Sequence, residues 1–128
     1  TGTAWAAAHQ ETICIFMEMQ WINSSDIHCD EFFNGPFEIT EKDTAYLLLK
    51  STGKTREVDE RALNFLNKFN AHTTVIDGLD YGMKELGEVS EYFDHSFYSE
   101  VLDVYNNLLA DRRQHPLSWR KYMWKFNY

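Results

Sequence analysis

Residues 43–50 read Asp-Thr-Ala-Tyr-Leu-Leu-Leu-Lys, a short apolar run with polar residues at both ends. This composition is typical of a strand that is buried on both faces. After it, apolar residues at helical spacing predict a helix over about 55–69. The β-branched run at 73–77 then predicts a second strand. A strand, a helix and a strand in this order predict an α/β fold whose parallel sheet is sandwiched by helices.

The sequence on either side of this unit is predicted to be mostly helical. A first helix is expected from about Thr3 to Asn23, because its second half is apolar on nearly all sides. Residues 29–38 predict one short helix that stops at Gly35-Pro36. A weaker third strand is expected near Val89 to Phe93, and a long final helix from about Ser96 to Arg113.

Thr1-Gly2-Thr3 leads directly into an Ala-rich helix. Such a turn is expected just after a buried strand, where it feeds a helix N-terminus. We therefore expect the first strand of the sheet to lie outside this sequence. The same loop is a candidate to line a ligand site through helix amides, or it is only a strand-to-helix turn.

Composition excludes several classes of protein. A chain of 128 residues is one domain or part of one, and its net charge of −8 argues against nucleic acid as a partner. No apolar run is long enough to predict a membrane span. The two cysteines do not predict a disulfide framework, so the cytoplasm is the expected location. The scattered histidines and cysteines lack metal-ligand spacing, and we expect no metal and no cofactor.

Glu18 is the lone acid in the most apolar stretch of the chain, residues 13–22. Burying an ionised carboxylate without a partner is costly, and a carboxyl group in that environment can both take and give protons. Glu18 is therefore a candidate catalytic base. The alternative is that Glu18 lies at the edge of the helix and reaches water, as most glutamates do.

The last segment, residues 112–128, is a basic and aromatic tail on an acidic body. It holds five of the twelve Lys and Arg residues and no acid. The tail could dock on its own domain, cover a site for an anionic ligand, or bind nucleic acid. Docking is preferred because Trp119, Tyr122, Trp124 and Phe126 are too apolar to remain in water. Docking and covering a site are compatible.

Several motifs together resemble the second half of the sugar isomerase (SIS) domain family. The apolar helix with Phe16-Met17-Glu18-Met19-Gln20 is followed by residues 31–39, Glu-Phe-Phe-Asn-Gly-Pro-Phe-Glu-Ile, and then by a buried strand. Residues 59–66, 113–117 and 122–125 extend the match. The resemblance is greatest to the bacterial branch that deglycates 6-phosphorylated fructosamines, such as fructoselysine-6-phosphate and fructose-aspartate-6-phosphate deglycases.

The resemblance implies a three-layer, flavodoxin-like domain and a particular organisation. Residues 1–128 would be the second, C-terminal SIS domain, incomplete at its N-terminus, with 112–128 as the closing tail. Family members carry two such domains, form homodimers or higher homo-oligomers, and place the active site between subunits. By this resemblance the chain has a phosphorylated sugar or fructosamine as its partner. Neither nucleic acid nor membrane is expected, because of the net charge and the lack of a long apolar run. The isolated chain is expected to be inactive and to self-associate.

The resemblance also implies roles for individual residues. The catalytic glutamate of the family falls on Glu18, and its catalytic histidine falls on Asn34, where this sequence departs from the pattern. Histidine can move a proton near neutral pH, whereas an amide only donates and accepts hydrogen bonds. Three alternatives follow: His28 or His115 takes over, ring opening is spontaneous, or activity is weak or absent. His28 could equally be an ordinary surface histidine.

The implied reaction reverses an Amadori rearrangement. Glu18 would remove the C1 proton of the open-chain 1-amino-1-deoxyfructose 6-phosphate and return a proton at C2. The imine would then hydrolyse to glucose 6-phosphate and an amine. The alternatives are a ketose–aldose phosphosugar isomerase, a non-catalytic phosphosugar-binding domain used in sensing, and a structural dimerisation module. The candidate substrate-binding residues are Thr1, Thr3, Glu31, Lys121 and Lys125.

Overall fold

A strand–helix–strand unit forms the centre of the molecule, in a computed structural model that describes residues 1–69 and 71–128. Strand β1 (Ala45–Lys50) leads through helix α2 (Arg56–Phe69) to strand β2 (His72–Asp77). The strands pair in parallel, from Ala45 opposite His72 to Lys50 opposite Asp77. The α/β fold with a parallel sheet, predicted from residues 43–77, is confirmed.

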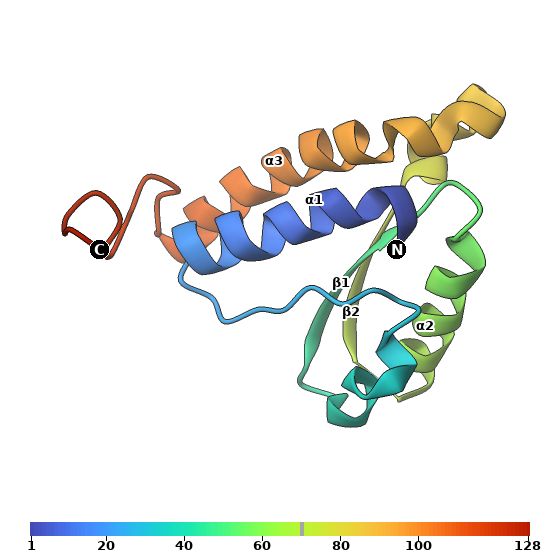
Figure 1. Cartoon of the computed structure of the whole chain (residues 1–128), viewed down its shortest axis with the longest axis horizontal. Helices are drawn as coiled ribbons and strands as arrows, with labels where there is room; N and C mark the ends of the chain where they lie inside the picture. Colours follow the sequence, from blue (N-terminus) through green and yellow to red (C-terminus); the bar gives the residue numbers. More distant parts are fainter. Residues whose placement is uncertain (70) are drawn as a thin grey trace.

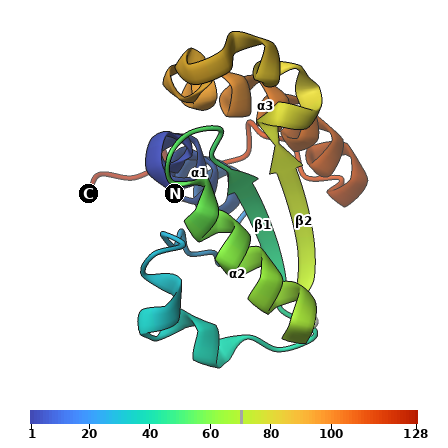
Figure 2. The ribbon, with the colours of Figure 1, turned by 90° about the vertical axis from the view of Figure 1, so that its right-hand side faces the viewer.

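The sheet lies between helices on its two faces, as Figures 1 and 2 show. Helix α2 covers one face, and α1 (Trp5–Gln10) together with α3 (Asp94–Arg113) covers the other. Successive strand residues point to opposite faces, so neighbouring leucines serve different cores. Leu48 packs with the α2 cluster, which includes Leu66, and Leu49 packs with Tyr98 of α3.

The first helix is continuous but changes its winding along its length. A 3₁₀ turn at Gly2–Ala4 leads into α1, and α1 continues as the π-helical segment η2 (Glu11–Met19). The predicted start near Thr3 is confirmed. The helix ends before the predicted Asn23, because Trp21 adopts a left-handed backbone conformation with φ of 55°. The π winding was not predicted.

The helix expected within residues 29–38 does stop at Gly35, as predicted, but it is only the short 3₁₀ helix η3 (Phe32–Asn34). A second 3₁₀ helix, η4 (Pro36–Ile39), follows and was not expected. The two helices are separated by Gly35, whose φ of 151° is a conformation that side chains disfavour.

The strand expected at Val89–Phe93 is part of the 3₁₀ segment η6 (Met83–Phe93), which follows the short turn η5 (Gly78–Tyr81). This segment buries Met83 and Ser90 and leaves Val89 exposed, so it packs through one face only. Its β-branched and aromatic residues favour a strand, but in the described part of the chain the segment pairs with neither strand of the sheet.

Helix α3 confirms the predicted final helix, and it begins two residues earlier than expected, at Asp94. It lies alongside α1 and η2 over most of its length (Figure 1). Gln114, in a left-handed conformation with φ of 52°, ends it and starts the irregular tail. In the described part of the chain, no helix combines the length and apolar character needed to cross a membrane.

Candidate active site

Glu18 forms an ion pair with Arg120 of the tail. Its Oε1 lies 2.8 Å from Nη2 of Arg120, and the side chains of Glu18 and Arg120 are 25% and 10% exposed. The expectation of an unpartnered carboxylate was therefore wrong, because the other end of the chain supplies a guanidinium. The tail does dock on its own domain, which was the preferred alternative.

A groove of about 670 Å³ contains both members of this ion pair. One wall comes from η2 and the residues that follow it, and the other wall comes from the tail. The lining residues are Ile13, Met17, Glu18, Trp21, Ile22, Asn23, Arg120, Lys121, Tyr122, Met123 and Tyr128. The groove therefore combines an apolar floor with one carboxylate and two cations, which suits a partly apolar anionic ligand.

A second hollow of about 390 Å³ shares Trp21, Arg120 and Met123 with the groove and adds Lys125. Lys121 lies over the indole of Trp21, with its Nζ 5.5 Å from the ring centroid. Both lysines that the resemblance suggested as ligands of a sugar or phosphate oxygen thus border the surface that carries Glu18. Arg120, which was not singled out from the sequence, lines both hollows.

Gln20 anchors the beginning of the tail. Its side chain is fully buried, and its Nε2 donates to the carbonyl of His115 over 2.7 Å. Nη1 of Arg113 donates in return to the backbone and side-chain oxygens of Gln20. His115 meets the ring of Trp21 edge-on, with 4.5 Å between the centroids. Of the two histidines considered as stand-ins, His115 is therefore the one that contacts a residue of the groove.

The aromatic side chains of the tail are less buried than expected. Trp119 is 48% exposed, while Tyr122, Trp124 and Phe126 are between 65% and 79% exposed. The argument that these residues are too apolar for water was therefore wrong for most of them. Docking depends instead on the contacts of Arg113, His115 and Arg120.

Three other candidate residues lie at the opposite end of the same helix from Glu18. Thr3 donates its hydroxyl hydrogen to Asp94 over 2.8 Å, and the hydroxyl of Thr1 accepts from the backbone N–H of Cys29. His28 stacks on Trp5, with 3.7 Å between the ring centroids. The thirteen helical steps from Trp5 to Glu18 span roughly 20 Å. These residues and Glu18 therefore do not share one site within a single chain.

Asn34 and Glu31 lie at η3, apart from both the groove and the N-terminal end of the first helix. Both are exposed, and the backbone N–H of Asn34 donates to the carbonyl of Glu31 over 2.8 Å. The surrounding segment packs on α2 through edge-to-face phenylalanine contacts, such as Phe32 with Phe65. Within residues 1–69 and 71–128, no hydrogen bond or ion pair joins Glu18 to Asn34 or Glu31.

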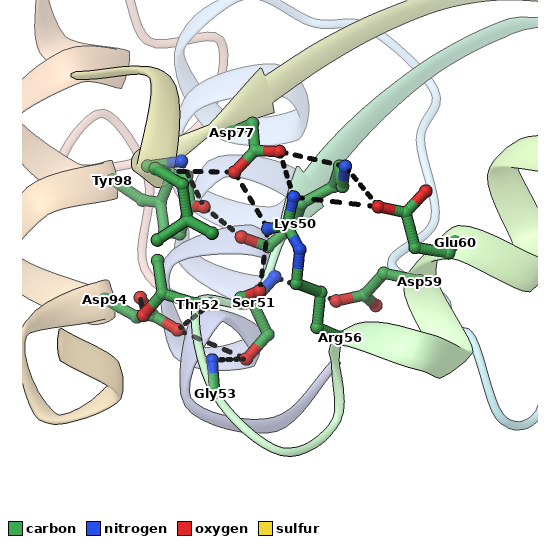
Figure 3. Close-up of polar contacts among 12 residues, drawn as sticks. Lys50, Ser51, Thr52, Gly53, Arg56, Asp59, Glu60, Asp77, Asp94 and Tyr98 are labelled. Atoms are coloured by element: carbon green, nitrogen blue, oxygen red, sulfur yellow. Dashed lines mark hydrogen bonds and ion pairs between the residues drawn. The ribbon is translucent and has the colours of Figure 1, made fainter. Parts of the chain in front are cut away.

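Carboxylates already occupy the backbone amides at the carboxyl end of β1, a place where α/β proteins often bind anions (Figure 3). Asp59 accepts from the N–H of Ser51 over 2.8 Å, and Asp94 accepts from the N–H and hydroxyl of Thr52. These acids are fully buried. Side chains also accept from the N–H groups of Gly53 and Lys54, so the amides of residues 51–54 belong to a structural network.

The end of β2 is held by a second charged cluster (Figure 3). Asp77 pairs with Arg56 and, over 2.8 Å, with Lys50, which also contacts Glu60 over 2.6 Å. Burial alone would raise the pKa of Asp77, but the hydrogen bonds from Arg56 and Lys50 lower it to about 2. Among the described residues, no group of three or more His, Cys, Asp or Glu side chains could hold a metal ion.

No protein-family model matches the chain. Solved structures do show which class of protein has this fold. A protein from Salmonella typhimurium LT2, classed provisionally as a phosphosugar isomerase, superposes with a TM-score of 0.96 at 50% identity, over 98% of this chain and 39% of that one. A Bacillus subtilis protein of the same provisional class gives 0.93 at 40% identity, over 98% and 38%. The fold is that of the phosphosugar isomerases of the SIS family.

Two curated relatives of this chain are deglycases. Fructosamine deglycase FrlB of Bacillus subtilis is 40% identical over 129 residues, which is 100% of this chain and 39% of the relative. Fructoselysine 6-phosphate deglycase of Escherichia coli K12 is 35% identical over 69 residues, 54% of this chain and 20% of the relative. The chain is a homologue of these deglycases, as its motifs indicated, and spans about two fifths of the length of FrlB.

Proposed function

We propose that this chain forms the C-terminal SIS domain of an enzyme that cleaves fructosamine 6-phosphates to glucose 6-phosphate and an amine. One observation carries the proposal: Glu18 lies in a groove with Arg120 and Lys121, in a chain 40% identical to a fructosamine deglycase. The groove is large enough for a sugar phosphate, since ligand sites span about 300–1,000 Å³.

Glu18 acts as the base that moves a proton between two carbons. It takes the C1 proton of the open-chain 1-amino-1-deoxyfructose 6-phosphate and returns a proton to C2, which leaves a C1=N imine. Water adds to the imine, and the amine leaves as glucose 6-phosphate forms. Arg120 holds Oε1 of Glu18, which orients the carboxylate and leaves Oε2 to transfer the proton.

The cations around the groove complement a phosphate. Arg120, Lys121 and Lys125 gather in a tail that carries no acid, on a chain of net charge −8. Among the described residues, Nε of Arg120 is buried and has no hydrogen-bond partner. An anionic oxygen could accept this hydrogen bond, which favours an anionic ligand beside Glu18.

A second copy of the chain supplies the remaining residues in this proposal. Asn34 and Glu31 are exposed and lie away from Glu18, and Thr1 and Thr3 lie at the far end of the Glu18 helix. An active site between subunits would bring such separated residues together. Because Asn34 cannot transfer a proton, ring opening is left to His115, to His28 or to water.

The test is a coupled glucose 6-phosphate assay of the full-length protein against a panel of phosphorylated Amadori compounds. The expected result is turnover that Glu18→Gln abolishes and that Glu100→Gln, at an exposed position on α3, leaves unchanged. Normal turnover by Glu18→Gln would remove the catalytic assignment. Release of an aldose phosphate that keeps its amine would indicate an isomerase instead.

Asn34 favours a second candidate function, a non-catalytic phosphosugar-binding domain used in sensing or regulation. The family position that should hold a proton-transferring histidine here holds an amide. Calorimetry on the full-length protein distinguishes the two functions, because a sensor binds fructosamine 6-phosphate without releasing glucose 6-phosphate. Asn34→His is expected to raise turnover of an enzyme and to leave a sensor inactive.

A further inference from the structure

The helix that carries Glu18 changes from α to π winding at Glu11. The N–H of Glu11 donates to the carbonyls of Ala7 and Ala8, as in tight helical turns. From there η2 has π winding, and the N–H of Gln20 donates over 2.8 Å to the carbonyl of Ile15, five residues earlier. π-Helical winding is rare in proteins overall, but where it occurs it is often at a functional site.

Two buried polar contacts lie at the point where the winding changes. Nδ2 of Asn106, in α3, donates to Oε2 of Glu11 over 3.0 Å, and these two residues are only 4% and 5% exposed. The hydroxyl of Thr12 donates over 2.9 Å to the carbonyl of Ala8, four residues earlier. A side chain that takes this carbonyl competes with the backbone bond of an α-helix.

The winding decides which way Glu18 points. In an α-helix, residues three, four and seven apart share a face, so Glu11 and Glu18 would both face α3. In a π-helix, bonding between residues five apart places residues four and five apart on one face. Ile13, Met17 and Glu18 have these spacings, and all three line the groove. Glu11 faces α3 instead, where it accepts from Asn106.

We propose that Glu11, Thr12 and Asn106 are positioning residues, which hold η2 in π winding and thereby aim Glu18 into the groove beside Arg120. The catalytic consequence rests on the proposed function, whereas the structural consequence does not. Burial raises the pKa of Glu11, while the bond from Asn106 opposes this rise. Because burial favours the neutral form, glutamine is a close replacement that keeps the accepting oxygen.

The experiment compares Thr12→Val and Asn106→Leu with Glu11→Gln in the full-length protein. Matched controls are Thr74→Val and Asn107→Leu, both at exposed positions. A displaced carboxylate can cost about a hundredfold in rate, so kcat should fall on the order of 10- to 100-fold in Thr12→Val and Asn106→Leu, with KM nearly unchanged. Glu11→Gln and the controls should stay within about twofold of the parent.

Crystal structures of the same variants separate this inference from the proposed function. If the parent has no deglycase activity, the direction of Glu18 is still visible, and Thr12→Val should show α winding with Glu18 apart from Arg120. The inference is overturned if both Thr12→Val and Asn106→Leu keep the π winding and the Glu18–Arg120 pair. An equal loss in Glu11→Gln and Asn106→Leu would also overturn the role of the accepting oxygen.

Discussion

The side-chain amide of Gln20 donates to the backbone carbonyl of His115 over 2.7 Å, from a position with no exposed surface. This bond joins the end of the Glu18 helix to the start of the tail. The same side chain accepts from Nη1 of Arg113 over 2.8 Å. One buried amide therefore satisfies a donor and an acceptor of the tail, and it fixes the tail where Arg120 reaches Glu18.

Replacement of this amide is expected to release the tail. Gln20→Leu leaves the carbonyl of His115 without its donor, which costs about 1–3 kcal/mol for a buried group. It also removes one of the two Gln20 oxygens that accept from Arg113 and keeps the backbone one. Limited proteolysis should then cut residues 115–128 faster, and urea unfolding should show the loss of stability. Gln10→Leu, at an exposed position, is the control. A tail equally protected in Gln20→Leu would refute the anchor.

The Asp77 cluster predicts acid sensitivity. The folded-state pKa of Asp77 is about 2, below its ordinary value of 3.8, so its stabilisation is complete above pH 4 and is lost as the pH falls towards 2. This difference is worth about 2 kcal/mol. Asp77→Asn should lower the free energy of unfolding by at least this much at pH 7. It should also weaken the pH dependence of that free energy between pH 4 and 2. The control is Asp80→Asn, at an exposed position. An unchanged pH dependence would contradict the assignment.

Tyr98 is expected to stabilise the fold through its hydroxyl group. It is fully buried, donates to the carbonyl of Lys50 and accepts from the N–H of Gly78 over 3.1 Å. Its pKa is raised by burial, so it stays a neutral donor at ordinary pH. Tyr98→Phe should lower the free energy of unfolding by about 1–3 kcal/mol, measured by thermal or urea unfolding. Tyr92→Phe, 74% exposed in the parent, should change little.

Self-association of the chain is expected from an apolar part of α3. Val104 is 61% exposed and Leu108 is 60% exposed, one helical turn apart. Exposed apolar patches of this kind favour association. Sedimentation should show dimers or larger species, and Val104→Glu with Leu108→Glu should shift them towards monomer. Asn107→Glu adds charge beside the patch as a control. A chain that sediments as a monomer at high concentration would count against this surface.

Local patterns were sufficient for the central unit. The strand at 45–50, the helix at 56–69 and the strand at 72–77 lie within a few residues of their predicted bounds, because each depends on its own hydrophobic spacing. The strand prediction at Val89–Phe93 was wrong because a strand does not depend on its own sequence alone. Its residues favour a strand, but strand formation needs a partner edge, which no local pattern reveals.

Glu18 shows the same division at the candidate site. The sequence alone was enough to single out this acid, the basic tail and the relation to deglycases, because these depend only on the types of residue and their order. The direction of its carboxylate depends on winding that Asn106 supports from α3, and its charge is paired by Arg120 from the far end of the chain. These contacts join residues distant in sequence, so only the packing of the helices decides them.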